Sequence, residues 1–287
     1  MDASMLGVGV GFDTKGAGEI VVKGIDKTRG TMYVIPDTRE GWVESLRLLL
    51  ETYFHRQPEI NFDYAEIRPA GIPIKGFGGV SSGPEPLMEV HEDIRKVLEN
   101  NSGEPISVTT IVDIMNLIGK CVVAGNVRRT AEIVFGDPHD EEYLDLKNYE
   151  VNPHRDQYGW TSNNSIFAEL GMDYTEAAKR IVDNGEPGFA WLDNMRHYSR
   201  MKNGGDDKDH RVAGGNPCLE QSLESYELCC LVETPRFIRR LSKNIKVCLS
   251  VCKNSYIRKN SLVRNQQSYV KKQKNRMFCK WCCSVYH

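Results

Sequence analysis

The segment Asn216-Pro217-Cys218-Leu219-Glu220 combines an amide, a thiol and a carboxylate, and Cys229 follows eleven residues after Cys218. Proline fixes its own φ and favours an extended residue before it. In an extended chain Cys218 and Glu220 point to the same side, with Asn216 on that side as well. A thiol can give or take hydrogen while a carboxylate moves a proton and an amide orients the substrate. The segment therefore predicts a catalytic site, with an ordinary turn around a buried cysteine as the alternative.

Two other segments carry groups that could bind phosphate. The first is the glycine-rich run 76–84, whose Gly78, Gly79, Ser81 and Ser82 stand directly before an apolar helical pattern. Backbone amides and hydroxyls at a helix N-terminus can cradle a phosphate. No Gly-Lys-Ser/Thr follows, so this is not a Walker motif, and a flexible turn is the alternative interpretation.

The second phosphate-binding candidate is the segment 124–129, which contains Asn126, Arg128 and Arg129. Paired arginines suit the recognition of phosphate or carboxylate groups. A solvated basic turn is the alternative. The seven histidines show no HExxH or other ligand spacing, so no metal site is predicted.

Helices and strands must position these segments, and both kinds alternate along the chain. Residues 6–30 contain glycine at short intervals and are expected to form loops. The pattern predicts strands over 31–35, 60–67 and 130–135. It predicts helices that begin at Asp37 with Glu40, before Leu87, at Thr110 with Asp113, and at Asp173 with Glu176, the last ending near Asn184-Gly185. This alternation favours an α/β architecture.

The composition is that of a soluble globular protein: 287 residues, 40% apolar and 26% charged, with a net charge of −2. No apolar run approaches the roughly 20 residues of a membrane helix, and the start carries no secretory pattern. We therefore expect a cytoplasmic protein without a membrane partner. Nine cysteines in such a protein indicate thiols, catalytic groups or metal ligands before structural disulfides.

The charge is distributed unevenly. Residues 234–287 contain 14 Lys or Arg and no acid, which leaves 23 basic and 39 acidic residues before them. We therefore divide the chain into 1–235 and a basic, cysteine-containing tail, 236–287. We favour read-through or a frame error as the origin of the tail. A tail that binds nucleic acid or a membrane surface, and a zinc site, are the alternatives. The cysteines of that zinc site would be Cys248, Cys252, Cys279 and Cys282.

Taken in order, the motifs resemble the adenosylcobalamin-dependent (class II) ribonucleoside-triphosphate reductases from about Leu6 to Thr234. The matching segments are VGVGFD, PDTREGW, EIRPAGIPIKGFGGVSSGPEPL, DIMNLIGKCVVAGNVRRTAEI, TSNNSIF, DNGEPGFAWLD and GGNPCLEQSLESYELCCLVET. The resemblance implies roughly the first half of a ten-stranded α/β barrel with a central finger loop, followed by an irregular basic tail.

The resemblance also implies residue roles. Cys218 would carry a thiyl radical generated with adenosylcobalamin (coenzyme B12) and abstract the 3′ hydrogen of a ribonucleoside triphosphate. Glu220 would act as base on the 3′ hydroxyl, Asn216 would hold the ribose hydroxyls, and Cys229 would be one of two reducing thiols. The 124–129 segment would link a deoxynucleotide effector to substrate choice. Thioredoxin or another dithiol would be the reductant, and a nucleic-acid partner is not expected.

The chain departs from the family pattern in two places. No cysteine precedes Cys121, so the second reducing thiol has no counterpart, and the resemblance stops after Thr234. We therefore expect an incomplete barrel that does not turn over alone. The alternative is a non-catalytic nucleotide-binding or regulatory fragment with a basic, nucleic-acid-binding tail.

Overall fold

The computed structural model describes residues 1–74, 79–124, 130–198, 205, 207–227, 231–233 and 282–284. The chain divides into two compact units, Met1–Ser225 and Tyr226–His287. In the second unit, β9 (Leu231–Glu233) pairs in parallel with β10 (Cys282–Ser284). The expected boundary between residues 235 and 236 lies outside the described residues.

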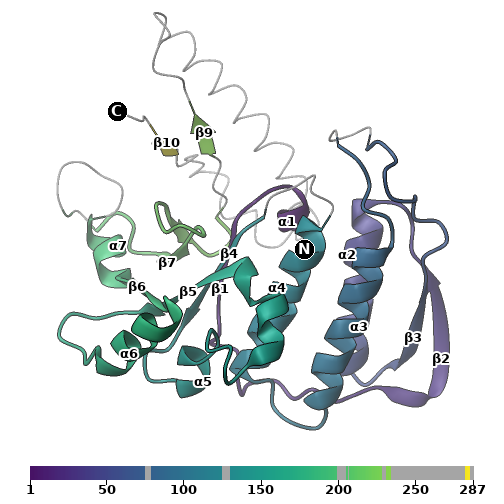
Figure 1. Cartoon of the computed structure of the whole chain (residues 1–287), viewed down its shortest axis with the longest axis horizontal. Coiled ribbons are helices and arrows are strands. Elements are labelled where there is room, and N and C mark those ends of the chain that lie inside the picture. Colours follow the sequence, from purple (N-terminus) through teal and green to yellow (C-terminus); the bar gives the residue numbers. More distant parts are fainter. Residues whose placement is uncertain are drawn as a thin grey trace, which may run out of the picture. The chain divides into compact units, whose positions relative to one another are not determined.

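A four-stranded parallel sheet forms the centre of the first unit (Figure 1). Its order is β1 (Val10–Asp13), β4 (Glu132–Gly136), β5 (Ser162–Phe167) and β6 (Gly188–Ala190). The sheet and its helices confirm the predicted α/β architecture, and β4 confirms the strand expected near 130–135. β1 lies within the segment that was expected to form loops only, so that expectation is wrong there.

Helix α4 (Val108–Val123) is apolar on nearly all sides, as expected of a buried helix. Val108 and Val112 pack with Val134 and Ile166 of the sheet, while its opposite side packs against the neighbouring helices. The helix begins one turn earlier than predicted because Ser107 Oγ accepts a hydrogen bond from the Thr110 amide at 3.1 Å.

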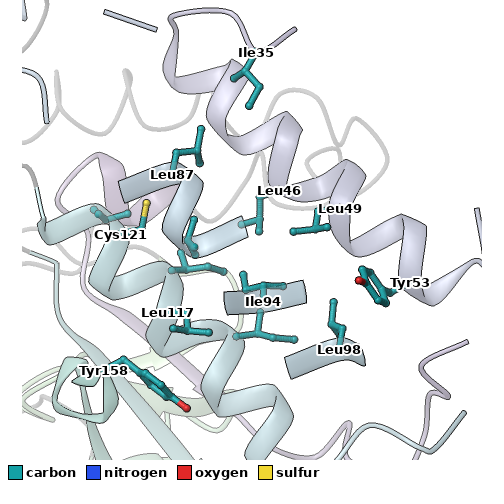
Figure 2. Packing of buried hydrophobic residues seen from close by; sticks show 14 of the residues in the cluster. Ile35, Leu46, Leu49, Tyr53, Leu87, Ile94, Leu98, Leu117, Cys121 and Tyr158 are labelled. Carbon is teal, nitrogen blue, oxygen red and sulfur yellow. The ribbon is translucent and has the colours of Figure 1, made fainter. Parts of the chain in front are cut away.

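A second layer contains α2 (Arg39–Phe54), α3 (Glu85–Asn100) and the parallel pair β2 (Asp26–Val34) and β3 (Pro58–Asp63). Apolar side chains of α2 and α3 meet those of α4 in one core (Figure 2). Helix α2 begins after Thr38, whose Oγ1 accepts a hydrogen bond from the Gly41 amide at 2.9 Å. The predicted start was Asp37. Asp37 instead pairs with Arg68.

Shorter elements complete the first unit. They are α1 (Asp2–Met5), α5 (Glu141–Leu144), the 3-10 turns Pro153–Gln157 and Gly159–Thr161, α6 (Thr175–Asn184), α7 (Leu192–Tyr198), β7 (Val212–Gly215) and β8 (Ser222–Glu224). Helix α6 ends as predicted, because Gly185 adopts a left-handed conformation with φ +76°. Among the described residues, none of the helices is long and apolar enough to cross a membrane.

Candidate functional site

Strands β7 and β8 form an antiparallel hairpin, and the predicted catalytic segment is its tip. The Leu219 amide donates to Asn216 O at 2.8 Å, and Asn216 N–H donates to Gln221 O at 3.1 Å. Leu219 adopts φ +58°. The segment is therefore a tight turn, and the expectation of an extended chain is wrong. The reason is the chain reversal that antiparallel pairing requires, which outweighs the local preference set by Pro217.

The turn brings two of the predicted side chains into contact. Asn216 Nδ2 donates to Glu220 Oε1 at 2.5 Å, while Asn216 Oδ1 accepts from the Gln221 amide at 2.9 Å. Asn216 is buried and Glu220 is exposed. Cys218 lies between them in sequence as a free, exposed thiol. The tip thus presents a fixed amide, a carboxylate held by it and an accessible sulfur.

The hairpin lies directly against the sheet at two glycines of the β1 region. A Cβ on Gly9 would lie 2.6 Å from Pro217 Cδ, and a Cβ on Gly11 would overlap Gly215 O. Contacts this short leave no space for a side chain at either position. Gly11, which was expected to lie in a loop, is therefore part of a strand that the hairpin contacts, and Gly9 directly precedes this strand.

Side chains of β4 and β5 hold the tip from the same face. Leu219 packs with the buried Ile133 and Phe135 of β4. Asn163 of β5 is paired in register with Ile133, and its Nδ2 donates to Pro217 O at 2.7 Å. Sequence analysis did not single out Asn163. Asparagine is depleted in strands, so its presence in a strand could have marked Asn163 as a candidate functional residue.

Of the predicted phosphate-binding residues in the glycine-rich run, Gly79, Ser81 and Ser82 are described and Gly78 is not. Ser81 Oγ accepts from the Gly83 amide at 3.1 Å. Helix α3 follows, with prolines at 84 and 86 that have no amide hydrogen to offer. Ser81 Oγ donates to Arg68 O at 3.4 Å and Ser82 Oγ donates to Gly83 O at 3.5 Å, so both hydroxyl hydrogens already have acceptors.

Asn126, Arg128, Arg129 and Cys229 lie outside the described residues. Their flanking elements are informative, because α3 and α4 are antiparallel neighbours joined by a 2.6 Å ion pair between Glu89 and Lys120. Leu87 near the start of α3 lies beside Cys121 near the end of α4 (Figure 2). Ser81 and Ser82 before α3 and Ala124 after α4 therefore lie at the same end of this helix pair.

A chain of buried polar groups lies away from the hairpin. Arg155 Nε donates to Asp113 at 2.8 Å, and Asn116 Nδ2 donates to Glu132 Oε2 at 3.2 Å. Glu132 Oε1 has no partner among the described residues. Burial raises the pKa of Glu132 to about 7. Sequence analysis did not find this group, since a lone glutamate in a strand pattern gives no sign of its burial.

The comparisons with known proteins agree with one another. Residues 15–98 match the model of the B12-dependent ribonucleotide reductase insertion domain. This range contains β2, α2, β3 and most of α3, which sequence analysis did not separate from the barrel. A curated relative from Euglena gracilis, an adenosylcobalamin-dependent ribonucleoside-triphosphate reductase, is 63% identical over 235 residues. The match covers 82% of this chain and 32% of the relative.

Two further matches have the same character. The Lactobacillus leichmannii adenosylcobalamin-dependent ribonucleoside-triphosphate reductase is 42% identical, covering 70% of this chain and 28% of the relative. A crystal structure of a B12-dependent (class II) ribonucleotide reductase superposes with a TM-score of 0.70 at 33% identity, covering 81% of this chain and 37% of that one.

The chain spans about a third of the length of the curated relatives it matches. Sequence identity and fold similarity cover the same large share of this chain. The predicted resemblance is confirmed: over about four fifths of its length, this chain is similar in sequence and fold to part of the adenosylcobalamin-dependent (class II) ribonucleoside-triphosphate reductases.

Proposed function

We propose that this chain contributes the radical-bearing part of a ribonucleoside-triphosphate reductase that depends on adenosylcobalamin. One observation carries the proposal: the turn that holds Asn216 against Glu220 leaves the Cys218 thiol exposed. The names of the relatives supply the substrate class and the cofactor. The β7–β8 hairpin would be the finger loop, and the parallel sheet would be part of the ten-stranded barrel.

The exposed sulfur fits a radical cofactor because a reagent can reach it without moving the hairpin. When bound, adenosylcobalamin would supply a carbon radical by homolysis of its carbon–cobalt bond. Cys218 would lose the hydrogen atom of its S–H group and become a thiyl radical. The thiyl radical would then take the 3′ hydrogen from the ribose and return it after reduction.

Proton transfer falls to Glu220, which would accept the proton of the 3′ hydroxyl. Asn216 holds Oε1 of this carboxylate and is itself fixed through the Gln221 amide, so the base is oriented before substrate arrives. The 2′ hydroxyl would leave as water after gaining a proton from one reducing thiol, and the hydrogen of the other would replace it at C2′. Cys229 and a second thiol would supply two electrons by forming a disulfide, which a dithiol such as thioredoxin would reduce.

The effector site would lie at the shared end of α3 and α4. The hydroxyls of Ser81 and Ser82 adjoin that end, as does the start of the segment that contains Asn126, Arg128 and Arg129. Arginine guanidinium groups recognise phosphate through paired hydrogen bonds. A deoxynucleotide held there would act at a distance from the hairpin tip, as allosteric control requires.

A chimera tests this function without assuming that the chain is complete. Residues 1–235 would replace the aligned segment of the Euglena gracilis relative, and ribonucleoside triphosphate turnover would be measured with adenosylcobalamin and a dithiol. We expect turnover, and Cys218→Ser should abolish it because an oxygen-centred group cannot replace the thiol. Cys229→Ser should reduce thioredoxin-supported turnover, whereas Cys230→Ser is the matched control and should not.

The arms of this experiment separate the claims. Turnover that survives Cys218→Ser would contradict the proposed radical residue. Loss of deoxynucleotide control in Arg128→Ala, with basal turnover retained, is expected if the effector site is as proposed.

A further inference from the structure

We infer that Asn163 is a positioning residue for Cys218, acting through the peptide bond that precedes the cysteine. The inference rests on the proposed function and names a residue of that same site. The Asn163 amide donates to Pro217 O at 2.7 Å, and this carbonyl belongs to the Pro217–Cys218 peptide group. Because a peptide group is planar, fixing its oxygen also fixes the direction of the Cys218 N–Cα bond.

The other hydrogen bonds that shape the turn are internal to the hairpin. The Leu219 and Gln221 amides both bond to Asn216, and the Asn216 amide bonds to Gln221 O. These bonds close the turn but do not tie it to the sheet, so a turn released from the sheet can open and expose its amides more often. Within the described part of the chain, the Asn163 bond is the side-chain hydrogen bond that runs from a sheet strand to the tip.

Apolar contacts between the tip and the sheet are non-directional. Pro217 lies on Gly9, and Leu219 packs with Ile133 and Phe135. Such contacts resist separation of the hairpin from the sheet but leave sliding and rotation less restricted. A directional hydrogen bond beside Cys218 restrains those motions. The restraint matters because a misplacement of about 1 Å can cost a reaction roughly a hundredfold in rate.

Asn163 is exposed, so its replacement is not expected to disturb the core. Its register partner Ile133 is buried, and the strand around it is held by ladder pairing with β4. Asn163→Asp keeps the size of the side chain but faces a carboxylate oxygen toward the Pro217 carbonyl oxygen. Asn163→His keeps a ring nitrogen donor at nearly the same place.

Hydrogen exchange of the full chain tests the inference, read at the Leu219 and Gln221 amides. In Asn163→Asp and Asn163→Ala we expect these amides to exchange about fivefold to tenfold faster, as the loss of one ordinary hydrogen bond predicts. Asn163→His should restore slow exchange. Asn61→Asp is the matched control, because Asn61 is likewise an exposed strand asparagine, on β3.

Amides of β4 serve as the internal reference and should exchange alike in all variants. Faster exchange confined to the tip, with rescue by histidine, supports the positioning role. Equal tip exchange in Asn163→Asp and Asn61→Asp, or faster exchange in β4 as well, overturns it. The measurement needs no turnover, so an inactive chimera would count against the proposed function while leaving this result unaffected.

Discussion

At the scale of single residues, the second layer is joined by a buried hydrogen-bonded histidine. Ser45 Oγ donates to Trp42 O at 2.8 Å and contacts His91 Nε2 at 3.1 Å, while Tyr64 Oη contacts His91 Nδ1 at 2.8 Å. Since the serine hydrogen is used on Trp42, Nε2–H donates to Ser45 and Nδ1 accepts from Tyr64. Every polar atom of this trio has a partner only when the ring is neutral.

This arrangement predicts a pH dependence of stability. Burial lowers the pKa of His91 to about 3, so the unfolded chain binds its proton first as pH falls. The contribution of neutral His91 to the free energy of unfolding is fully present above pH 6.5 and is lost progressively below it. Lowering the pH from 7.5 to 5 should therefore reduce the free energy of unfolding by about 2 kcal/mol. His91→Gln should remove this dependence, as measured by chemical denaturation at both pH values.

The raised pKa of Glu132 acts in the opposite sense, because the folded chain then holds a proton that the unfolded chain has released. Only the difference between the variant and the unaltered chain therefore isolates His91. His55→Gln is the control, since His55 is exposed at the end of α2. A pH dependence that is unchanged in His91→Gln would contradict this account.

At the scale of elements, helices were predicted better than the hairpin. The spacing of Leu46, Leu49 and Tyr53 identifies the buried face of α2. Residues three or four apart in sequence lie on the same face of a helix, so local spacing is enough to find that face. The local rules failed where distant segments decide the conformation. Gly11 lies in a strand because β1 pairs with β4, and Asn216–Glu220 turns because β7 pairs with β8.

The close approach at β1 predicts the effect of a single methyl group. Gly9→Ala and Gly11→Ala would place a Cβ against Pro217 and Gly215 O, so the hairpin must shift. Overpacking of this kind typically costs about 1–3 kcal/mol. We expect lower unfolding free energies in both variants, as measured by chemical denaturation. Gly16→Ala is the control because nothing lies within 4 Å of its Cβ. Equal behaviour of Gly11→Ala and Gly16→Ala would contradict the packing argument.

At the scale of the whole molecule, the sequence motifs predicted the resemblance but not the placement of the site. The ordered motifs carried the resemblance, and the comparisons confirm it over most of the chain. The bond from Asn163 to Pro217 joins residues far apart in sequence, and periodicity contains no information about such pairs. Likewise, the amino-acid composition does not change at the ends of the segment 15–98 that matches the insertion domain, so composition gives no sign of it.

The division of the chain into two units predicts the effect of truncation. Ending the chain after residue 235 should shift the melting temperature of the first unit by less than about 2 °C, because Met1–Ser225 contains its own core. Differential scanning calorimetry would measure this. Ending the chain at residue 210 is the contrasting variant: it removes β7 and β8 and should lower the melting temperature by more. Equal melting temperatures for the two truncations would contradict the prediction.

The contact of Gly9 and Gly11 with Pro217 and Gly215 also orders events during synthesis. About 200 residues separate the two sides of this contact, so at 5–20 residues per second the ribosome needs roughly 10–40 s to deliver the second side after the first. Closing so long a loop is entropically costly and slow compared with local helix formation. The glycine face of β1 therefore waits, uncovered, on the nascent chain until the hairpin emerges. The contact forms only when Gly215 and Pro217 reach this strand.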